Sequence, residues 1–367
     1  MSQNHLATAI SEFGYSAHKD PYNAKKWRHS GHFKFTYSGL FPIFKLSLDI
    51  NDRSANQYTP FLYLNDDGSA SIEIQSREIK TPSVKGNIKI YIPFNFTSGG
   101  WNKGLIPQIS YSISNDRFKT GLTIQEMEQK WTNKGEKFEP YMAVVFVGST
   151  KGKNQLQQSI QGSLRGYTML PVANSAVYPK WGIGAEIGFY SNIGNISYYS
   201  PVGYAYCYGY IPGIMQTHGI RLTAIHQKNL RSMSCFNQNV VNILPRGLSD
   251  NAWAANWLAQ RNFDITKLTA DYAIPIYIGD ITLGGNWMAI KRLVAYPHFD
   301  YTFAGKQGLW SAGLDLTADL HAIITLEWPC SLGLSFSWNG GSAWDSLTNN
   351  GISMNKWFIG PIFNVSF

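Results

Sequence analysis

Four histidines and three serines lie on segments whose alternation predicts β-strands, and these residue types could carry out acyl transfer. Hydrolysis or transfer of an acyl chain needs a nucleophile, a histidine base and a group that orients the histidine. None of the seven forms a motif with diagnostic spacing; they are His218, His226, His298, His321, Ser311, Ser331 and Ser335. We therefore expect these histidines to be satisfied or exposed, and the chain not to be an enzyme.

Metal and nucleotide chemistry has no better support in the sequence. Cys207, Cys235 and Cys330 are too scattered for a zinc site, and their odd number argues against a disulfide framework. No glycine pattern that could hold a phosphate stands where a strand meets a helix. The sequence predicts no cofactor and no metal.

The element with the clearest pattern is the C-terminal stretch Asn355 to Phe367, which reads NKWFIGPIFNVSF. Every second residue is apolar, and small or polar residues fall between them; the apolar set is Trp357, Ile359, Pro361, Phe363, Val365 and Phe367. Soluble strands usually have about five or six residues, whereas a tilted membrane-crossing strand needs roughly nine to eleven. We interpret this stretch as the closing strand and insertion signal of a transmembrane β-barrel.

Composition agrees with one large barrel spanning residues 1–367. The chain is 44% apolar with a mean hydropathy of −0.19, as expected when half of each strand faces a polar lumen. Aromatic residues reach 14% while charged residues are only 15%, which suits aromatic girdles at two membrane interfaces. No window holds about eighteen consecutive apolar residues, so a spanning helix is excluded. The net charge of +8 suits loops that face anionic lipid headgroups, and no nucleic-acid recognition motif accompanies it.

Alternation predicts eleven strands before a long unpatterned segment, Asn229 to about Arg261, and five strands after it. The first is expected at Asn4–Ser16, followed by a basic loop at His18–His29. Residues Asn51–Asp67 are expected to form a longer loop. Separate strands are then expected at Ser69–Ile79, Val84–Phe96 and Tyr141–Gly148, whereas residues 116–139 could be a loop, a helix or a strand. An even total of about sixteen is what a single-chain bacterial barrel allows.

Charged residues on these strands identify the inner face. Lysines that pointed at lipid near the bilayer centre would be costly, so we expect them to face the lumen. The luminal set is Lys85, Lys89, Glu186, Asp315 and Asp319. A barrel of this kind must be exported, yet the first sixteen residues lack a basic start, an apolar core and a cleavage site. We therefore expect the chain to be the C-terminal part of a longer protein with a signal peptide and an upstream domain.

This layout resembles the BamA and bacterial-surface-antigen superfamily of outer-membrane assembly barrels. Its members place a long loop inside a sixteen-stranded barrel between the eleventh and twelfth strands. The loop tip carries an Arg-Gly-aromatic motif, and a later strand carries an aromatic-x-Asp-x-Gly motif. Here Arg246-Gly247-Leu248 lies in the corresponding loop, and Phe299-Asp300-Tyr301-Thr302 lies on the corresponding strand. Leu248 stands in place of the aromatic residue and Thr302 in place of the glycine.

A closer resemblance is to barrels of Bacteroidetes that follow a TolB-like β-propeller domain. The stretches that carry it are SQNHLATA, LRGY, YPKWGIGAEIGF and ITKLTADYAIPIY. Such a protein would have its signal peptide and propeller upstream of residue 1.

The resemblance implies a pair between the loop and the barrel wall, formed by Arg246 with Gly247 and by Asp300. A charge-assisted bond between arginine and carboxylate is stronger in a partly dehydrated lumen than in water. The alternative to this pair is that Arg246 lies in an exposed loop and Asp300 faces luminal water. Leu164-Arg165-Gly166-Tyr167 matches the loop motif more literally but lies on a predicted strand, so we interpret Arg165 as an ordinary luminal charge.

Three functions remain open at this point. The resemblance implies an outer-membrane barrel of a Gram-negative cell that assists insertion or export of protein or lipid, with a seam between the first and last strands. Its expected partners are outer-membrane lipids such as lipopolysaccharide, assembly components or periplasmic proteins, and no nucleic acid. The alternatives are a passive diffusion channel and a non-catalytic scaffold for surface or periplasmic partners.

Overall fold

The computed structural model describes most of the chain, and the following concerns that part alone. It comprises residues 2–3, 8–20, 23–64, 70–119, 154–171, 177–193, 199–230, 237–249, 251–283, 288–323, 330–349 and 354–365.

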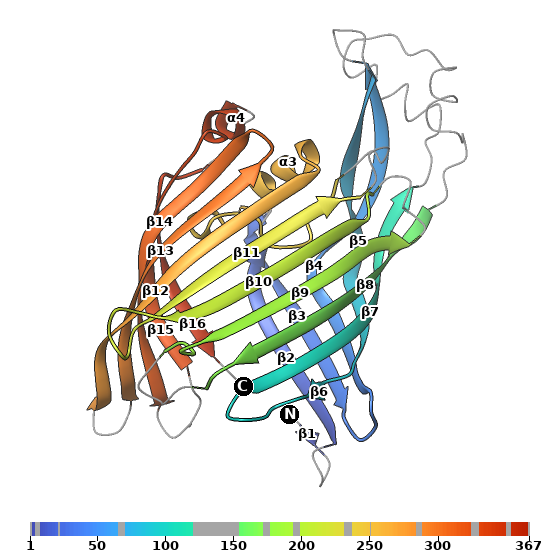
Figure 1. The fold of residues 1–367 in the computed structure, drawn as a ribbon. Helices are drawn as coiled ribbons and strands as arrows, with labels where there is room; N and C mark the ends of the chain where they lie inside the picture. Colours follow the sequence, from blue (N-terminus) through green and yellow to red (C-terminus); the bar gives the residue numbers. More distant parts are fainter. Residues whose placement is uncertain are drawn as a thin grey trace.

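The described residues form one sheet of sixteen strands that curls into a barrel (Figure 1). Strands follow one another around the sheet in chain order, except that β6 pairs only with β7. Neighbours are antiparallel apart from a short parallel contact between β4 and β7. The strands are β1 (Ser2–Gln3), β2 (Ala9–Asp20), β3 (Asn23–Tyr37), β4 (Ile43–Leu64), β5 (Ala70–Tyr91), β6 (Phe94–Asn95), β7 (Asn102–Lys119), β8 (Asn154–Met169), β9 (Gly182–Ile193), β10 (Val202–Pro212), β11 (Gly219–Asn229), β12 (Asp264–Leu283), β13 (Met288–Ala304), β14 (Gln307–Ile323), β15 (Cys330–Gly340) and β16 (Trp357–Val365).

Three short helices complete the described elements, and all belong to connections between strands. The 3-10 helix η1 (Arg246–Leu248) and helix α3 (Ala252–Arg261) lie between β11 and β12, and α4 (Trp344–Asn349) lies between β15 and β16. None of the helices in the described part of the chain has the length and apolar character needed to cross a bilayer.

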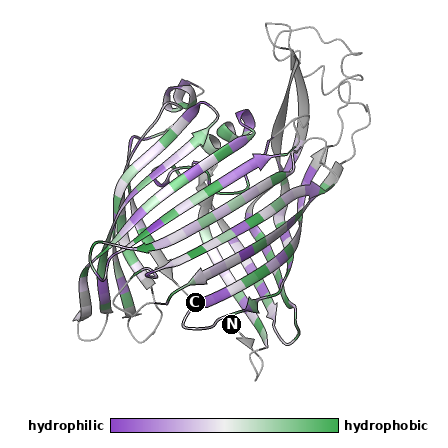
Figure 2. Ribbon diagram, in the orientation of Figure 1, coloured by the Kyte–Doolittle hydropathy of each residue, from purple (hydrophilic) through white to green (hydrophobic). Residues whose placement is uncertain are grey.

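The two faces of the sheet differ in polarity as the alternation predicts. On β15 the outward side chains Leu334 and Trp338 are exposed, while Ser335 and Ser337 between them are buried on the inner face. The same inversion holds on β9, β13 and β14, where the exposed residues are Ile187, Phe299 and Leu316 and the buried ones are Glu186, Asp300 and Asp315. Figure 2 shows the hydropathy alternating along the strands. A soluble protein buries its large apolar residues; here the outer wall exposes them. The all-β fold, the polar interior and the inserted loop before the last five strands are confirmed.

Several predicted boundaries are wrong. The expected loop Asn51–Asp67 belongs largely to β4, which continues to Leu64. The expected strands Ser69–Ile79 and Val84–Phe96 are joined in β5, which ends at Tyr91, and Phe94–Asn95 form the separate β6. The expected basic loop His18–His29 belongs mostly to strands, because β2 continues to Asp20 and β3 begins at Asn23. The hairpin of β4 and β5 rises above the neighbouring strands (Figure 1). Beyond the membrane neither face of a strand has to be apolar, so alternation carries no signal there.

The strand count agrees with expectation for partly different reasons. β1 and β6 have two residues each, and neither was predicted as a separate strand. The predicted strand Tyr141–Gly148 lies outside the described residues, as does the ambiguous segment beyond Lys119. The first predicted strand begins at Ala9 as β2, and residues 4–7 lie outside the described part. No pairing of β16 with β1 or β2 occurs among the residues that the structure describes.

Candidate functional site

The described part of the connection between β11 and β12, residues 237–249 and 251–263, turns inward at the upper end of the barrel (Figure 1). Its apolar residues pack with the tops of β12–β14 and with α4 in a small hydrophobic core. Ile243, Leu244, Leu258 and Leu347 have at most 1% of their surface exposed. Fully burying a large aliphatic side chain stabilises by about 1.5–3 kcal/mol. This core therefore holds the loop inside the barrel independently of any charge.

The ends of the two helices fix the path of the loop. Asn251 caps α3, since its side-chain oxygen accepts a hydrogen bond of 3.0 Å from the Ala254 backbone N–H. Such a cap contributes about 1 kcal/mol. The segment just before it makes the tight turn of η1, in which the backbone N–H of Leu248 donates to the Pro245 carbonyl at 3.0 Å. Arg246 is thereby placed at the loop tip.

Arg246 binds carboxylates from three consecutive strands of the wall. Its Nη2 lies 2.5 Å from Asp271 Oδ1 on β12 and 3.7 Å from Asp300 Oδ1 on β13. Its Nη1 lies 2.9 Å from Asp315 Oδ2 on β14. Asp300 also accepts a 2.7 Å hydrogen bond from the Arg246 backbone N–H through Oδ2. The fork of the guanidinium, which suits several carboxylates at once, ties the loop tip to β12–β14.

Burial alone would lower the pKa of Arg246, but the carboxylates of Asp271 and Asp300 outweigh it and raise the pKa. The guanidinium is therefore a permanent positive charge. Lys267 on β12 is buried nearby, close enough for Asp300, Arg246 and Asp271 to act on it electrostatically. A buried charge is tolerated only when it is paired and hydrogen-bonded, which makes each member of the cluster dependent on the others.

Two further wall residues hold the loop by its backbone. The Lys267 ammonium donates a 2.5 Å hydrogen bond to the Leu244 carbonyl, and the Thr302 hydroxyl donates a 2.6 Å bond to the Ile243 carbonyl. Both side chains are buried. Buried carbonyls that lost these donors would be left unsatisfied, at a cost of about 1–3 kcal/mol each.

Gly247 lies against the inner wall at β15. A Cβ on Gly247 would fall 2.3 Å from Oδ1 and 2.7 Å from Nδ2 of Asn339, which has 1% of its surface exposed. No real Cβ approaches so closely, so a side chain at residue 247 would force Asn339 or the loop to move. The glycine allows the loop tip to approach the wall closely.

Of the residues singled out in the sequence, the structure brings Arg246, Gly247 and Asp300 together. Leu248, in place of an aromatic residue, is buried in the core of the loop, and Thr302, in place of a glycine, binds the loop backbone. The sequence did not identify Asp271, Lys267 or Thr302 as loop contacts, and it named Asp315 only as a luminal charge. Alternation was the available signal, because it places these residues on the inner face.

Arg165 lies on β8 and pairs with Glu186 on β9 at 2.7 Å, as an ordinary luminal charge would. At the C-terminus, Trp357 is exposed on the outer wall and stacks on Trp338, with the ring centroids 5.6 Å apart. Phe363 and Val365 lie on β16 opposite Leu332 and Cys330. Phe367 lies outside the described residues.

Among the side chains that the structure describes, the histidines and serines singled out in the sequence do not meet at the outer wall. His218 Nδ1 lies 2.9 Å from the Tyr272 hydroxyl, and His226 Nδ1 lies 2.9 Å from Thr266 Oγ1. Ser331 and Ser335 donate to Asp319 and Asp315 at 2.7 and 2.6 Å, and Ser311 is wholly buried. The side chain of His321 falls outside what the structure describes.

His298 was also among the histidines considered, and it has a serine and a carboxylate nearby. Its Nε2 lies 3.3 Å from Ser337 Oγ and its Nδ1 lies 3.6 Å from Asp315 Oδ2. Ser337 has none of its surface exposed, so no substrate can reach its hydroxyl. No group of three or more His, Cys, Asp or Glu side chains suited to a metal ion occurs in the described ranges.

No family model matches the sequence, and no curated protein matches it. Among solved structures, the chain is similar to the crystal structure of BamA from Haemophilus ducreyi lacking POTRA domains 1–3. The two are 9% identical, with a TM-score of 0.39, over 98% of this chain and 70% of that one.

Proposed function

We propose that the chain is an outer-membrane β-barrel of the assembly or translocation type, which assists insertion or export of protein or lipid. The observation that carries the proposal is the loop tip itself, which Arg246 fixes to Asp271, Asp300 and Asp315 across three neighbouring strands. Burying charged groups to fix a loop inside the lumen costs free energy. Such a fixed loop suits a barrel whose inner wall and loop must act together.

The wall supports a membrane location. Large apolar side chains are exposed on its outer face, including Leu334 on β15, Leu316 on β14 and Ile187 on β9. Exposed in water, an apolar surface of that extent would drive association. In a bilayer it meets hydrocarbon, and the polar inner face is sheltered from lipid. The role needs no bond chemistry, and we propose that the chain is not an enzyme in this capacity.

The first test asks whether the wall faces lipid. We expect the purified chain to require detergent or lipid to remain folded and monomeric. A folded monomer in plain buffer would overturn the membrane proposal.

The second test locks the seam between β2 and β16. Cysteines are introduced along Ala9–Asp20 and Trp357–Val365 in a background in which Cys207, Cys235 and Cys330 are alanine, and cross-linking pairs are selected by oxidation. We expect oxidation to stop the assembly of other outer-membrane proteins in cells depleted of the native protein, and reduction to restore it. The control is Thr223→Cys with Thr269→Cys, which lie directly opposite each other on β11 and β12. Unchanged assembly with the seam locked would count against the proposal.

A passive channel is the second candidate, because a cavity of about 640 Å³ lies in the lumen beside the loop. It is lined by polar residues such as Arg221, Asp271 and Asp319 together with Phe358 and Ile362 of β16. Conductance in planar bilayers separates the two functions. The assembly type predicts a small, flickering current because the loop occupies the lumen, whereas a large steady current would favour diffusion.

A further inference from the structure

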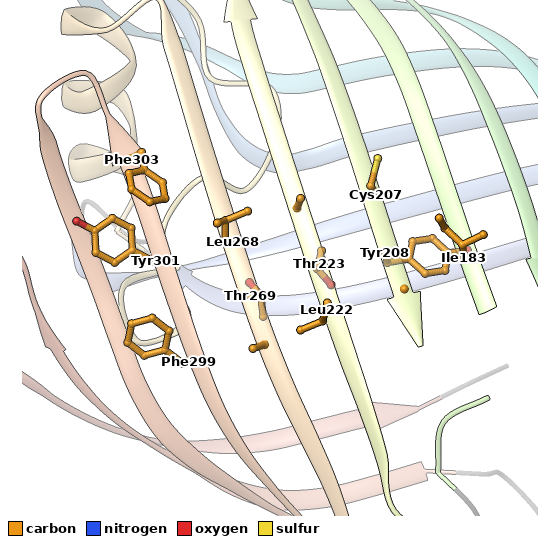
Figure 3. Close-up of a pocket in the computed structure, with 13 residues that line it drawn as sticks. Ile183, Cys207, Tyr208, Leu222, Thr223, Leu268, Thr269, Phe299, Tyr301 and Phe303 are labelled. Atoms are coloured by element: carbon orange, nitrogen blue, oxygen red, sulfur yellow. The ribbon is translucent and has the colours of Figure 1, made fainter. Parts of the chain in front are cut away.

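Figure 3 shows a groove in the outer wall from β9 to β13, lined by side chains such as Leu222, Leu268 and Phe299. These side chains are hydrocarbon and can only pack against other hydrocarbon. A group of side chains suited to bond chemistry lies instead on the inner wall, on the neighbouring strands β2, β3 and β4. The outer faces of these strands are apolar, with Phe13 and Leu46 exposed on them. The polar residues that alternate with them therefore face the lumen.

Ser16 on β2, His32 on β3 and Asp49 on β4 are joined by hydrogen bonds on this inner face. Oγ of Ser16 lies 3.2 Å from Nε2 of His32, and Nδ1 of His32 lies 2.8 Å from Oδ1 of Asp49. His32 and Asp49 are directly opposite each other in the ladder, and Ser16 is opposite Ser30, two residues from His32. Serine, histidine and carboxylate in this order are a nucleophile, its base and the group that orients the base.

The partners of His32 fix the role of each of its ring nitrogens. A carboxylate can only accept a hydrogen bond, so Asp49 keeps the ring proton on Nδ1. Nε2 is then an acceptor, and the Ser16 hydroxyl donates to it. Oδ1 of Asp52 is 3.9 Å from Nε2, too far for a hydrogen bond, which leaves this nitrogen to the serine. His32 is therefore arranged to take a proton from Ser16 and to return it.

Two serines reach Nε2, and Ser16 is the accessible one. Oγ of Ser30 lies 3.3 Å from Nε2 of His32 and 2.5 Å from Oγ of Ser16. Ser30 has only 1% of its surface exposed, whereas Ser16 is half-buried. The side chains of His32 and Asp49 are 33% and 38% exposed. A molecule in the lumen can therefore reach Ser16, while Ser30 serves as its hydrogen-bond partner.

The sheet opens next to this cluster. Pairing between β3 and β4 ends at Gly31 and Ile50, and β4 pairs with β5 again only from Ser54. In the described part of the chain, residues 51–53 thus have no ladder partner, and Asn51 has a left-handed backbone with a φ of 58°. Bulges and left-handed residues of this kind concentrate at functional sites.

The bulge lies against the histidine and is held there. Nδ2 of Asn51 donates a hydrogen bond of 2.8 Å to the His29 carbonyl on β3, and Asp52 is the residue that approaches His32. Backbone N–H groups outside the ladder are the donors that a developing oxyanion needs. The opening of the sheet therefore supplies, beside the serine and histidine, donors that a regular strand would use in its ladder.

The surroundings of the cluster on the inner face are charged. Lys34, two residues from His32, pairs with Glu12 at 2.7 Å. Lys85 of β5 lies directly opposite Asp49. A long acyl chain would lie against these charges, whereas a short acyl group on a polar alcohol stays hydrated in the lumen. The substrate class that fits is an ester of a short carboxylic acid.

We propose that Ser16, His32 and Asp49 form a serine-hydrolase site that cleaves short carboxylic esters. Oγ of Ser16 bonds to the carbonyl carbon of the ester while its proton passes to Nε2 of His32. The bond from that carbon to the alcohol oxygen then breaks, and the alcohol leaves with the proton from Nε2. Water repeats both steps on the acyl-serine, which releases the carboxylic acid and restores the Ser16 hydroxyl. Ser16 and His32 are the catalytic residues, and Asp49 is a positioning residue.

This activity goes beyond the proposed function and does not rest on it. Assembly or translocation needs no bond chemistry, and the cluster around Arg246 has no part in cleaving an ester. A barrel that assembles other proteins but cleaves no ester would lose only the present inference, and the reverse result would lose only the assembly role.

The test is labelling of the purified full chain in detergent with an alkyl fluorophosphonate, which phosphonylates an activated serine and releases fluoride. Intact mass shows the adduct, and peptide mass spectrometry locates it. We expect one adduct per chain, on Ser16, and hydrolysis of p-nitrophenyl acetate by the same material. Ser16→Ala should abolish both. Ser112→Ala is the control and should behave as the wild type, because this inner-wall serine of β7 donates to Asn87 at 3.1 Å.

Further variants separate a working site from a polar network. His32→Gln removes the base and should slow labelling about a hundredfold or more. Asp49→Asn keeps the size, but its amide can donate to Nδ1 and leave the ring proton on Nε2, so we expect a similar loss. Asp49→Glu restores a carboxylate and should recover part of the rate, although asparagine is the closer fit in size. Ser30→Ala should label within about tenfold of the wild type, and circular dichroism checks that each variant is folded.

Absence of an adduct on the wild type would overturn the proposal, as would an adduct on Ser30 or on any other serine. An adduct that forms equally fast in His32→Gln would assign the cluster a purely structural role and also overturn it. The position of the adduct is determined on the wild type, so the result does not depend on whether a variant folds.

Discussion

Arg221 and Asp271 lie directly opposite each other on β11 and β12, but the carboxylate of Asp271 binds Arg246 of the inserted loop. The Nη2 of Arg221 donates instead to the Tyr206 hydroxyl at 3.3 Å, and its Nε has no hydrogen-bond partner among the described residues. Arg246 of the loop therefore binds a carboxylate that lies opposite Arg221 on the adjacent strand. Through Asp271, the position of the loop affects how the charge of Arg221 on the wall is balanced.

This arrangement predicts that Arg221 and Arg246 are energetically coupled through Asp271. In the wild type, Arg221→Gln should change stability little. In an Arg246→Ala background, Asp271 is free to pair with Arg221, so the same substitution should cost more. A double-mutant cycle, measured by urea unfolding in lipid vesicles, should give a coupling of roughly 0.5–3 kcal/mol. Additive effects of the two substitutions would contradict partner exchange.

Removing Arg246 alone should be severe. Arg246→Ala leaves three inner-wall carboxylates without their main countercharge, and breaking a buried ion pair from one side costs about 3–5 kcal/mol. We expect a lower urea midpoint in vesicles and a larger, steadier current in planar bilayers as the loop is released. Arg165→Ala is the matched control, because Arg165 is half-exposed and its buried partner Glu186 keeps a hydrogen bond from the Tyr204 hydroxyl. The current should not change, because this pair joins β8 to β9 and not the loop to the wall.

Gly247→Ala should displace the loop tip by steric contact with Asn339. Inserting a methyl group into a packed site costs about 1–3 kcal/mol. Replacing Asn339 by serine in the same chain removes the colliding atoms and should recover part of the loss. Gly162→Ala is the control, since a Cβ on that glycine of β8 meets nothing within 4 Å. Equal unfolding midpoints for the two alanine variants would show that the close approach at Gly247 does not contribute to the free energy of unfolding.

Alternation predicted the barrel well where lipid and lumen impose opposite demands on the two faces of a strand. On β14, Leu314 and Leu316 are exposed outside, and Ser311 and Asp315 are buried inside, as their spacing indicates. It failed where neither face has to be apolar. Residues 51–64 carry no alternating pattern, yet they extend β4, with a register irregularity after Ile50 and a left-handed backbone at Asn51.

The candidate site was predicted in part for a similar reason. Spacing places Asp271, Asp300 and Asp315 on inner faces, but which of them meet depends on the stagger of three strands. Asp300 pairs in register with Thr269 and Ser311, whereas Asp271 lies level with His298. Hydrogen-bond register is a property of the folded sheet, so spacing alone did not show which carboxylates meet the loop. The motif resemblance pointed to Asp300 and to neither of the other two. The backbone anchors at Lys267 and Thr302 needed the path of the loop as well.

Thr302 offers a test of the loop that alters no charge. Thr302→Val keeps the shape of the side chain but removes the hydroxyl that donates to the Ile243 carbonyl. Because that carbonyl then lies buried without its donor, we expect a loss of about 1–3 kcal/mol in unfolding free energy. Thr223→Val is matched to it: Thr223 is also buried on the inner wall, but its hydroxyl has no partner in the described part of the chain. Valine there removes an unsatisfied polar group, so its unfolding midpoint should be unchanged or higher. If both variants lost the same stability, the hydroxyl of Thr302 would not anchor the loop. The arginine cluster and the apolar core would then be what keeps the loop in place.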